Sequence, residues 1–347
     1  MSLSRAAGGG RSTPSLGAVV VSENGAAVLT FAVLAGLPLV ASDYAVFILP
    51  QYMLYGVLAM SLGLFWGFAG ILSFGQAAFF ALGAYTMGLA MHGGGVAGVI
   101  DGAYLGLFLA ALGAGALAAA VGYFLFSAGI RDTYFVIITI ALSIIAEQLA
   151  ITQSQITGGG NGMFIDRMML NLGPLGSFSL EGDAAMYYFV LPIAGLVYLA
   201  LRRLVGTKFG KVLVGIRENE DRVISLGLDA SLYKTAAFAL SGALAGFAGA
   251  LYATHASFIA PSLGGVLFST EVVVWVAIGG RTSLLGALLG GIVVASLSNY
   301  LSAITPEYWQ LVLGLLFVAV IVYFKGGVAG ALAAMLKARR GRAGEHG

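Results

Sequence analysis

Residues 44–100 contain no aspartate, glutamate, lysine or arginine, and the stretches 102–130, 235–270 and 282–306 share this property. One helical crossing of a bilayer takes about 20 apolar residues, so the first stretch is long enough for two crossings. In lipid only helices and closed barrels satisfy the backbone hydrogen bonds, and barrel strands alternate in polarity. These runs do not alternate, and they therefore predict an all-α, polytopic membrane protein.

The composition supports the same class. Of the 347 residues, 9% are charged and 59% are hydrophobic, whereas a soluble domain has about 25% charged residues. A soluble enzyme, a disordered chain and a nucleic-acid binder are excluded. The chain has no cysteine, and its three histidines show no ligand spacing, so no metal site is predicted. The phosphate-loop pattern is also missing from the sequence, so neither a bound cofactor nor ATP hydrolysis by this chain is expected.

About ten crossings are predicted, and the eighth of them is a short segment, broken or re-entrant, that ends before Gly279 and Gly280. Their approximate bounds are residues 26–41, 44–66, 71–91, 104–126, 133–152, 186–201, 235–253, 266–278 (the short segment), 284–301 and 309–324.

The distribution of basic residues predicts the orientation. With ten crossings, all lysines and arginines except Arg167 lie on one side, which the positive-inside rule makes cytoplasmic. Both termini then lie in the cytoplasm. The predicted organisation is a flexible tail (1–24), a transmembrane domain (25–332) and a basic tail (333–347). Within the domain, 202–234 forms a cytoplasmic loop and 153–185 a periplasmic loop.

The loop 202–234 concentrates much of the charge in the chain. Its apolar positions predict two short amphipathic helices, with Asn219 as an N-cap, Glu220 in the first turn that follows, and Gly227 as a C-terminal stop. Two interpretations stay open on these grounds. The loop is either a solvated linker that obeys the charge rule, or a docking surface whose apolar stripe fits a groove on a partner.

Four stretches together resemble the permease subunits of branched-chain amino acid ABC importers, the LivM type. They are KFGKVLVGIRENE at residues 208–220, AFALSGALAGFAGALY at 237–252, GFAGILSFGQAAFFALGAY at 67–85 and TGGGNG at 157–162. The segment EVVVWVAIGG at 271–280 is similar to a related branch that carries urea and short amides. The resemblance leaves the substrate open between these classes.

The resemblance implies that the charged loop couples the chain to an ATP-binding subunit. The residues implied in this role are Phe209, Val212, Ile216, Arg217, Glu218, Asn219, Glu220, Arg222, Leu226 and Gly227. It also implies a second permease chain, different or identical, two cytoplasmic ATP-binding subunits that use ATP and Mg²⁺, and a periplasmic binding protein. The membrane would be the bacterial inner membrane.

A carboxylate within a membrane-spanning segment is costly to bury, and we therefore treat each one as a candidate functional residue. Glu147 is either an interfacial carboxylate that reaches water or a pathway residue. Glu271, one turn before Trp275, is either bonded to a neighbouring helix or part of a path. The glycine-rich loop around Thr157, Gly159 and Asn161 is either a flexible outer loop or a gate, and the resemblance favours the gate. Gln76, within the resembling stretch 67–85, completes the candidate path residues.

The expected function is therefore an importer permease without catalytic activity of its own. An ion-coupled secondary transporter is the alternative from another class, and it would need several interacting ionisable groups within the helices. Only Glu147 and Glu271 are candidates for that role. The sequence thus favours a path driven by a separate ATPase.

Overall fold

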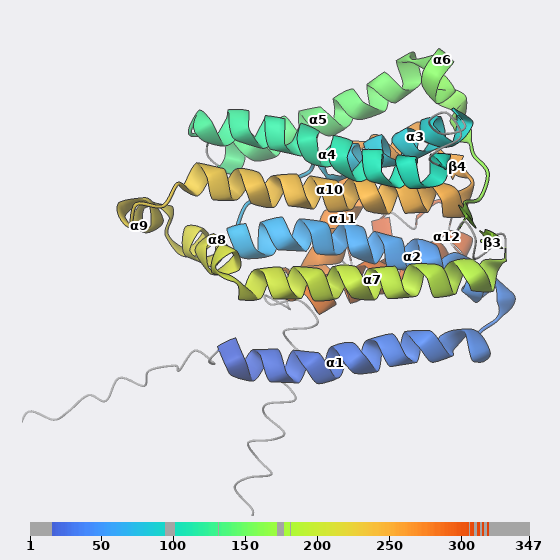
Figure 1. Cartoon of the computed structure of the whole chain (residues 1–347), viewed down its shortest axis with the longest axis horizontal. Coiled ribbons are helices and arrows are strands. Elements are labelled where there is room, and N and C mark those ends of the chain that lie inside the picture. Colours follow the sequence, from blue (N-terminus) through green and yellow to red (C-terminus); the bar gives the residue numbers. More distant parts are fainter. Residues whose placement is uncertain are drawn as a thin grey trace, which may run out of the picture.

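The protein is a bundle of long helices, shown as a computed structural model in Figure 1. The structure describes residues 16–93, 101–130, 132–171, 177–180 and 182–304, with isolated positions between 306 and 318. In this part of the chain, six helices are long and apolar enough to cross a membrane. These spans are Asp43–Ala69, Gly102–Ser127, Thr133–Thr152, Asp183–Gly206, Ala230–Ala256 and Leu284–Ile304. The predicted all-α class is confirmed.

In chain order the helices are α1 (Leu16–Gly36), α2 (Asp43–Leu62), α3 (Gln76–His92), α4 (Gly102–Ser127), α5 (Asp132–Thr152), α6 (Ser154–Thr157), α7 (Asp183–Gly206), α8 (Lys208–Glu218), α9 (Glu220–Ser225), α10 (Ala230–Ala256), α11 (Val266–Gly279) and α12 (Leu284–Ile304). Short strands β1 (Met163–Phe164) and β4 (Phe258–Ile259) pair antiparallel, as do β2 (Met169–Asn171) and β3 (Ser177–Ser179).

Six spans are fewer than the ten predicted crossings, for identifiable reasons. The apolar helices at Gly25–Leu39 and Val266–Gly279 are shorter than a full span. The predicted crossing 71–91 is shortened to α3, because the backbone from Gly70 to Gly75 is not helical. Most of the predicted crossing 309–324 and the basic tail 333–347 lie outside the described residues, as do residues 1–15 of the predicted N-terminal tail. Helix α1 begins at Leu16, within that tail segment.

Helices α2 and α10 form the centre of the bundle. Buried residues make up 72% of the most apolar window of α2 but only 22% of that of α5, which places α5 at the periphery. Helix α10 packs against α2, α3 and α4, and the packing against α3 is glycine-mediated. A Cβ on Gly83 of α3 would overlap the carbonyl oxygen of Gly246, and one on Gly249 would overlap that of Phe80. Small residues at helical spacing thus let α3 and α10 approach closely.

Two breaks in the helical backbone lie at opposite ends of the bundle. After α2 the chain forms a π-helix (Gly63–Ala69), and Gly70 then adopts a left-handed conformation at φ +84°, which glycine tolerates without a steric penalty. After α10 the chain passes through β4 and a 3₁₀ turn (Pro261–Gly264) before α11 begins. The second break precedes the predicted short segment, and the first begins within the predicted connection at 67–70 and extends to Gly75.

One end of the bundle carries α8 and α9, which we call the basic end. The opposite end carries α6, β3 and β4 (Figure 1). Helix α1 lies along the outside and packs on α7, where the Tyr187 hydroxyl donates to the carbonyl oxygen of Leu34 at 2.5 Å. This arrangement separates the charged loop from the glycine-rich loop by the length of the helices.

Candidate functional site

Some of the apolar side chains predicted to lie along α8 and α9 are buried, and others are exposed to the surroundings. Leu213, Ile216 and Val223 are buried against the bundle, while Ile224 is 53% exposed and Leu226 is 74% exposed. The buried side chains fix the two helices to the protein. The exposed pair leaves an apolar surface at the tip of the basic end, which we call the tip pair.

Arg217 connects α8 to the end of α2. Its Nη1 donates a hydrogen bond of 2.6 Å to the carbonyl oxygen of Gly67, and its Nη2 lies 2.7 Å from Glu218 Oε1. Its side chain also packs on Gly70, where any Cβ would meet Arg217 Cγ at 2.6 Å. The π-helical turn that ends α2 is therefore held by α8 through both a hydrogen bond and a close contact.

Most of the other predicted coupling residues make contacts within the basic end itself. Asn219 caps α9 by accepting from the backbone of Arg222 at 2.9 Å, as the sequence predicts, and Gly227 follows α9 at φ +80°. Glu220 Oε1 lies 2.5 Å from the buried Lys234 Nζ of α10. Phe209 packs its ring on Tyr233 at 5.8 Å. Arg222 is exposed, and Val212 is partly buried.

Gln76 lies in a fully buried polar cluster rather than on an open surface. Its Nε2 donates to Ser241 Oγ at 3.0 Å, and its Oε1 accepts from Ser61 Oγ at 3.2 Å. Because Ser61 lies on α2 and Ser241 on α10, the amide ties the start of α3 to both central helices.

A second set of hydroxyls satisfies the broken backbone before α3. The carbonyl oxygen of Phe74 accepts from Ser143 of α5 at 2.6 Å and from Ser269 of α11. The backbone nitrogen of Ala77 donates to the same Ser269 at 3.2 Å, and that of Phe74 donates to Thr139 at 3.1 Å. Irregular backbone at membrane depth needs such partners because lipid supplies none.

Glu147 lies beside the start of α11. A Cβ on Gly265, the N-cap of that helix, would be 2.5 Å from Glu147 Oε2. A negative charge at this position suits the positive end of the helix dipole. Glu147 and Glu271 therefore lie near the same helix but are not brought together in one pocket.

The glycine-rich loop forms a compact turn at the opposite end. Thr157 Oγ1 donates to the carbonyl oxygen of Ala150 at 2.6 Å, and Gly159 has φ +63°. Asn161 is exposed. Gly162 packs on Phe258 of β4, so the loop is anchored to the break before α11.

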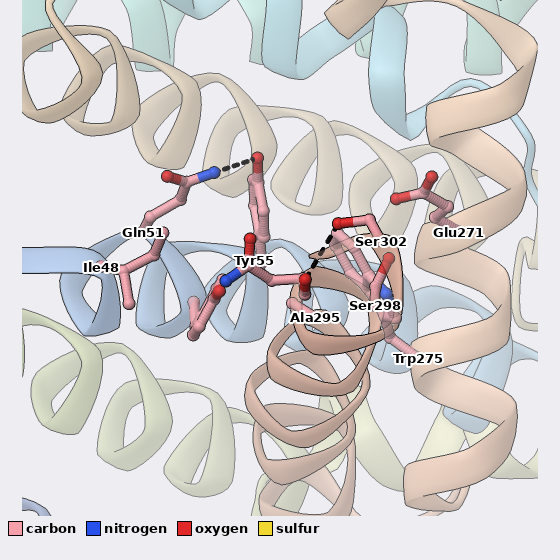
Figure 2. A pocket seen from close by; sticks show the side chains of 10 residues that line it. Ile48, Gln51, Tyr55, Glu271, Trp275, Ala295, Ser298 and Ser302 are labelled. Atoms are coloured by element: carbon pink, nitrogen blue, oxygen red, sulfur yellow. Dashed lines mark hydrogen bonds between the residues drawn. The ribbon is translucent and has the colours of Figure 1, made fainter. Parts of the chain in front are cut away.

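Glu271 and Trp275 line one pocket of about 220 Å³ between α2, α11 and α12. Figure 2 shows the Glu271 carboxylate directed from α11 into the space beside Gln51 and Tyr55 of α2. The Trp275 ring stacks on Tyr55 with centroids 4.9 Å apart. Helix α12 contributes the hydroxyl and amide side chains of Ser298, Asn299 and Ser302.

Sequence reasoning missed the α2 wall of this pocket. Gln51 donates to the Tyr55 hydroxyl at 2.8 Å, and the Tyr52 hydroxyl is buried without a hydrogen-bond partner. These uncharged side chains stand in a long apolar run, and no local signal marks them. Among the described residues, no group of three or more His, Asp or Glu side chains is arranged to hold a metal ion.

Comparison with known proteins gives one consistent result. Residues 44–321 match the family model described as the branched-chain amino acid transport system permease component. The high-affinity branched-chain amino acid transport system permease protein LivM of Escherichia coli is 30% identical over 327 residues, covering 88% of this chain and 75% of that protein. A probable LivM protein of Methanocaldococcus jannaschii is 28% identical, covering 72% of this chain and 78% of that protein.

A more partial likeness extends to another transport system. The autoinducer 2 import system permease protein LsrC of Salmonella paratyphi B is 25% identical over 169 residues, with 47% of this chain and 48% of that protein covered. No solved structure matches.

Proposed function

The chain belongs to the branched-chain amino acid transport permease family, and on this premise we propose that it forms part of the path by which an ATP-driven importer moves branched-chain amino acids inward. The observation that carries the proposal is the family match along residues 44–321. We call α8 and α9, together with Leu226 and Gly227, the coupling segment. Through it an ATP-binding subunit would move the helices that line the path.

The proposal includes three kinds of partner. A second permease chain, different or identical, would complete the path, and two ATP-binding subunits would supply the energy, because the sequence lacks a phosphate loop. A periplasmic binding protein would deliver the solute. Bound ATP and the docked binding protein must favour different conformations for import to be driven.

We place the coupling segment on the ATP-binding subunit through the tip pair, Ile224 and Leu226. Apolar side chains exposed beside charged ones are the usual composition of a helix that docks in a partner's groove. The inward-facing side chains and the Arg217 bond would transmit the movement of that helix to the end of α2.

The proposed topology is ten crossings in the bacterial inner membrane, with both termini and the basic end in the cytoplasm. Two observations support it. The loop 202–234, which holds seven of the 17 lysines and arginines, lies at one end of the bundle, as the positive-inside rule requires of a cytoplasmic face. The apolar segments around α1, α3 and α11 and residues 309–324 supply the crossings beyond the six long spans.

Co-purification tests this function. The chain, expressed with its candidate ATP-binding subunits, should retain them, and Leu226→Glu should release them because it puts a charge in the docking surface. Ile156→Glu, an exposed substitution at the opposite end of the bundle, is the matched control and should keep the subunits bound. Transport by the chain reconstituted alone, with no ATPase bound, would instead establish a secondary transporter.

A further inference from the structure

The pocket between α2, α11 and α12 has a chemical character that the permease role does not explain. Among the described residues that line it, Glu271 is the only carboxylic acid, and its carboxylate has no hydrogen bond or ion pair with any of the described residues. No lysine, arginine or histidine is among the described residues that line it. A carboxylate held inside a membrane protein without a partner is costly, and such groups mark ligand pathways.

We propose that this pocket binds the ammonium group of an apolar amino acid, with Glu271 as the anionic partner of that group. The proposal rests on the proposed function and adds the chemical group that this chain recognises. An ammonium group would supply the positive charge and the donors that the carboxylate lacks in the protein.

A second polar group in the pocket also lacks a partner. Tyr52 is 5% exposed, and its hydroxyl makes no hydrogen bond although it lines the cavity. A buried hydroxyl without a partner costs free energy. Tyr52 lies on α2 and Glu271 on α11, so two residues with unsatisfied polar groups line the cavity from different helices.

The walls suit the rest of such a solute. The stacked rings of Tyr55 and Trp275, joined edge-on by Phe268 at 5.7 Å from Trp275, make a rigid aromatic surface for an aliphatic side chain. Aromatic faces also attract a nearby cation. The volume of about 220 Å³ is below the range of about 300–1,000 Å³ found for drug-sized ligands, and it fits a solute of amino-acid size.

The negative charge of Glu271 should make the pocket prefer an amine, which binds as an ammonium ion, over a neutral amide. Both can donate N–H groups to Glu271, but only an ammonium ion compensates its charge. Glu271→Gln keeps the acceptor oxygen and removes the charge. Amine binding should therefore fall in this variant, while amide binding should persist.

Tryptophan fluorescence of the purified permease complex, without binding protein, measures this directly. We expect L-leucine and 3-methylbutylamine to quench the emission, and 4-methylpentanoate, which has no amine, to leave it unchanged. Glu271→Gln should weaken the binding of 3-methylbutylamine by about 10- to 100-fold, as expected for losing a hydrogen bond between charged groups. Trp275→Phe should abolish the signal and so identify its source.

Two outcomes overturn the proposal. Equal affinity of the wild-type complex for 3-methylbutylamine and 4-methylpentanamide would show an amide pocket, and unchanged amine affinity in Glu271→Gln would show that the carboxylate does not bind the ligand. Thr270→Val is the matched control, because Thr270 is exposed on the same helix and bonds only within it. It should bind as the wild type does.

Uptake separates this proposal from the proposed function. In proteoliposomes with the complete importer, Glu271→Gln should lose leucine uptake while binding-protein-stimulated ATP hydrolysis continues, which also shows that the variant is folded and assembled. A wild-type complex that binds 3-methylbutylamine but never couples ATP to uptake would overturn the importer function and leave the ammonium site standing. Full leucine uptake by Glu271→Gln would overturn the site.

Discussion

Arg217 of α8 donates a hydrogen bond of 2.6 Å to the carbonyl oxygen of Gly67, so the coupling segment directly holds the π-helical end of α2. That turn leads through Gly70 to the broken backbone before α3. Under the proposed coupling role, a displacement of α8 would reach a central helix directly through the Arg217 side chain.

Replacing Arg217 should uncouple the importer. In Arg217→Lys the ammonium group cannot reproduce the fork that binds Gly67 and Glu218 together, so leucine uptake should fall by about tenfold while ATP hydrolysis continues. The ratio of transported solute to hydrolysed ATP in proteoliposomes measures the effect. Arg203→Ala, an exposed substitution at the end of α7, should keep the wild-type ratio. An unchanged ratio in Arg217→Lys would remove this contact from the coupling route.

Gly83→Ala should destabilise the bundle. The added methyl group would overlap the carbonyl oxygen of Gly246 and push α3 away from α10, at a cost of about 1–3 kcal/mol. Thermal unfolding in detergent should show a lower midpoint. Gly113→Ala on α4 is the control, because its Cβ meets nothing within 4 Å and alanine favours a helix by about 1 kcal/mol. A midpoint for Gly83→Ala equal to that of the control would contradict the observed helix contact.

Ser269→Ala should destabilise the break before α3. It removes the acceptor for the Ala77 backbone nitrogen and one donor to the Phe74 carbonyl oxygen, and an unsatisfied buried group costs about 1–3 kcal/mol. Hydrogen exchange at Ala77, read by mass spectrometry, should accelerate. In Ser296→Ala, which loses only a bond to its own helix, exchange at Ala77 should stay as in the wild type. Equal protection in both variants would argue against this role.

Helices whose apolar run ends at a polar or glycine signal could be predicted from the sequence. The predicted bounds of α4, α5, α10 and α12 agree with the structure to within a few residues, and Asn219 caps α9 as its type suggests. The predicted crossings 44–66 and 71–91 place a connection at 67–70, but hydropathy could not show that the break extends to Gly75, because residues 71–75 are nearly as apolar as the helices beside them. What marks it is a positive φ and hydroxyl partners from α5 and α11, which are distant in sequence.

The candidate site divides in the same way. Glu271 and Trp275 are four residues apart on one helix, so their shared wall follows from helical spacing. Tyr52 and Tyr55 reach that wall only because α2 packs on α11, which periodicity cannot show. The sequence also could not show which apolar residues of α9 are buried. Val223 and Ile224 are adjacent and both apolar, yet Val223 is buried and Ile224 is exposed.

The Phe74 carbonyl oxygen is shared by hydroxyls from α5 and α11, and Gln76 fastens the same stretch to α2 and α10. Phe74 and Gln76 are two residues apart, so these hydrogen bonds form one cluster that joins five helices: α2, α3, α5, α10 and α11. If the proposed transport cycle rocks the helices against one another, we expect the motion to pivot around this cluster and to leave its hydrogen bonds intact.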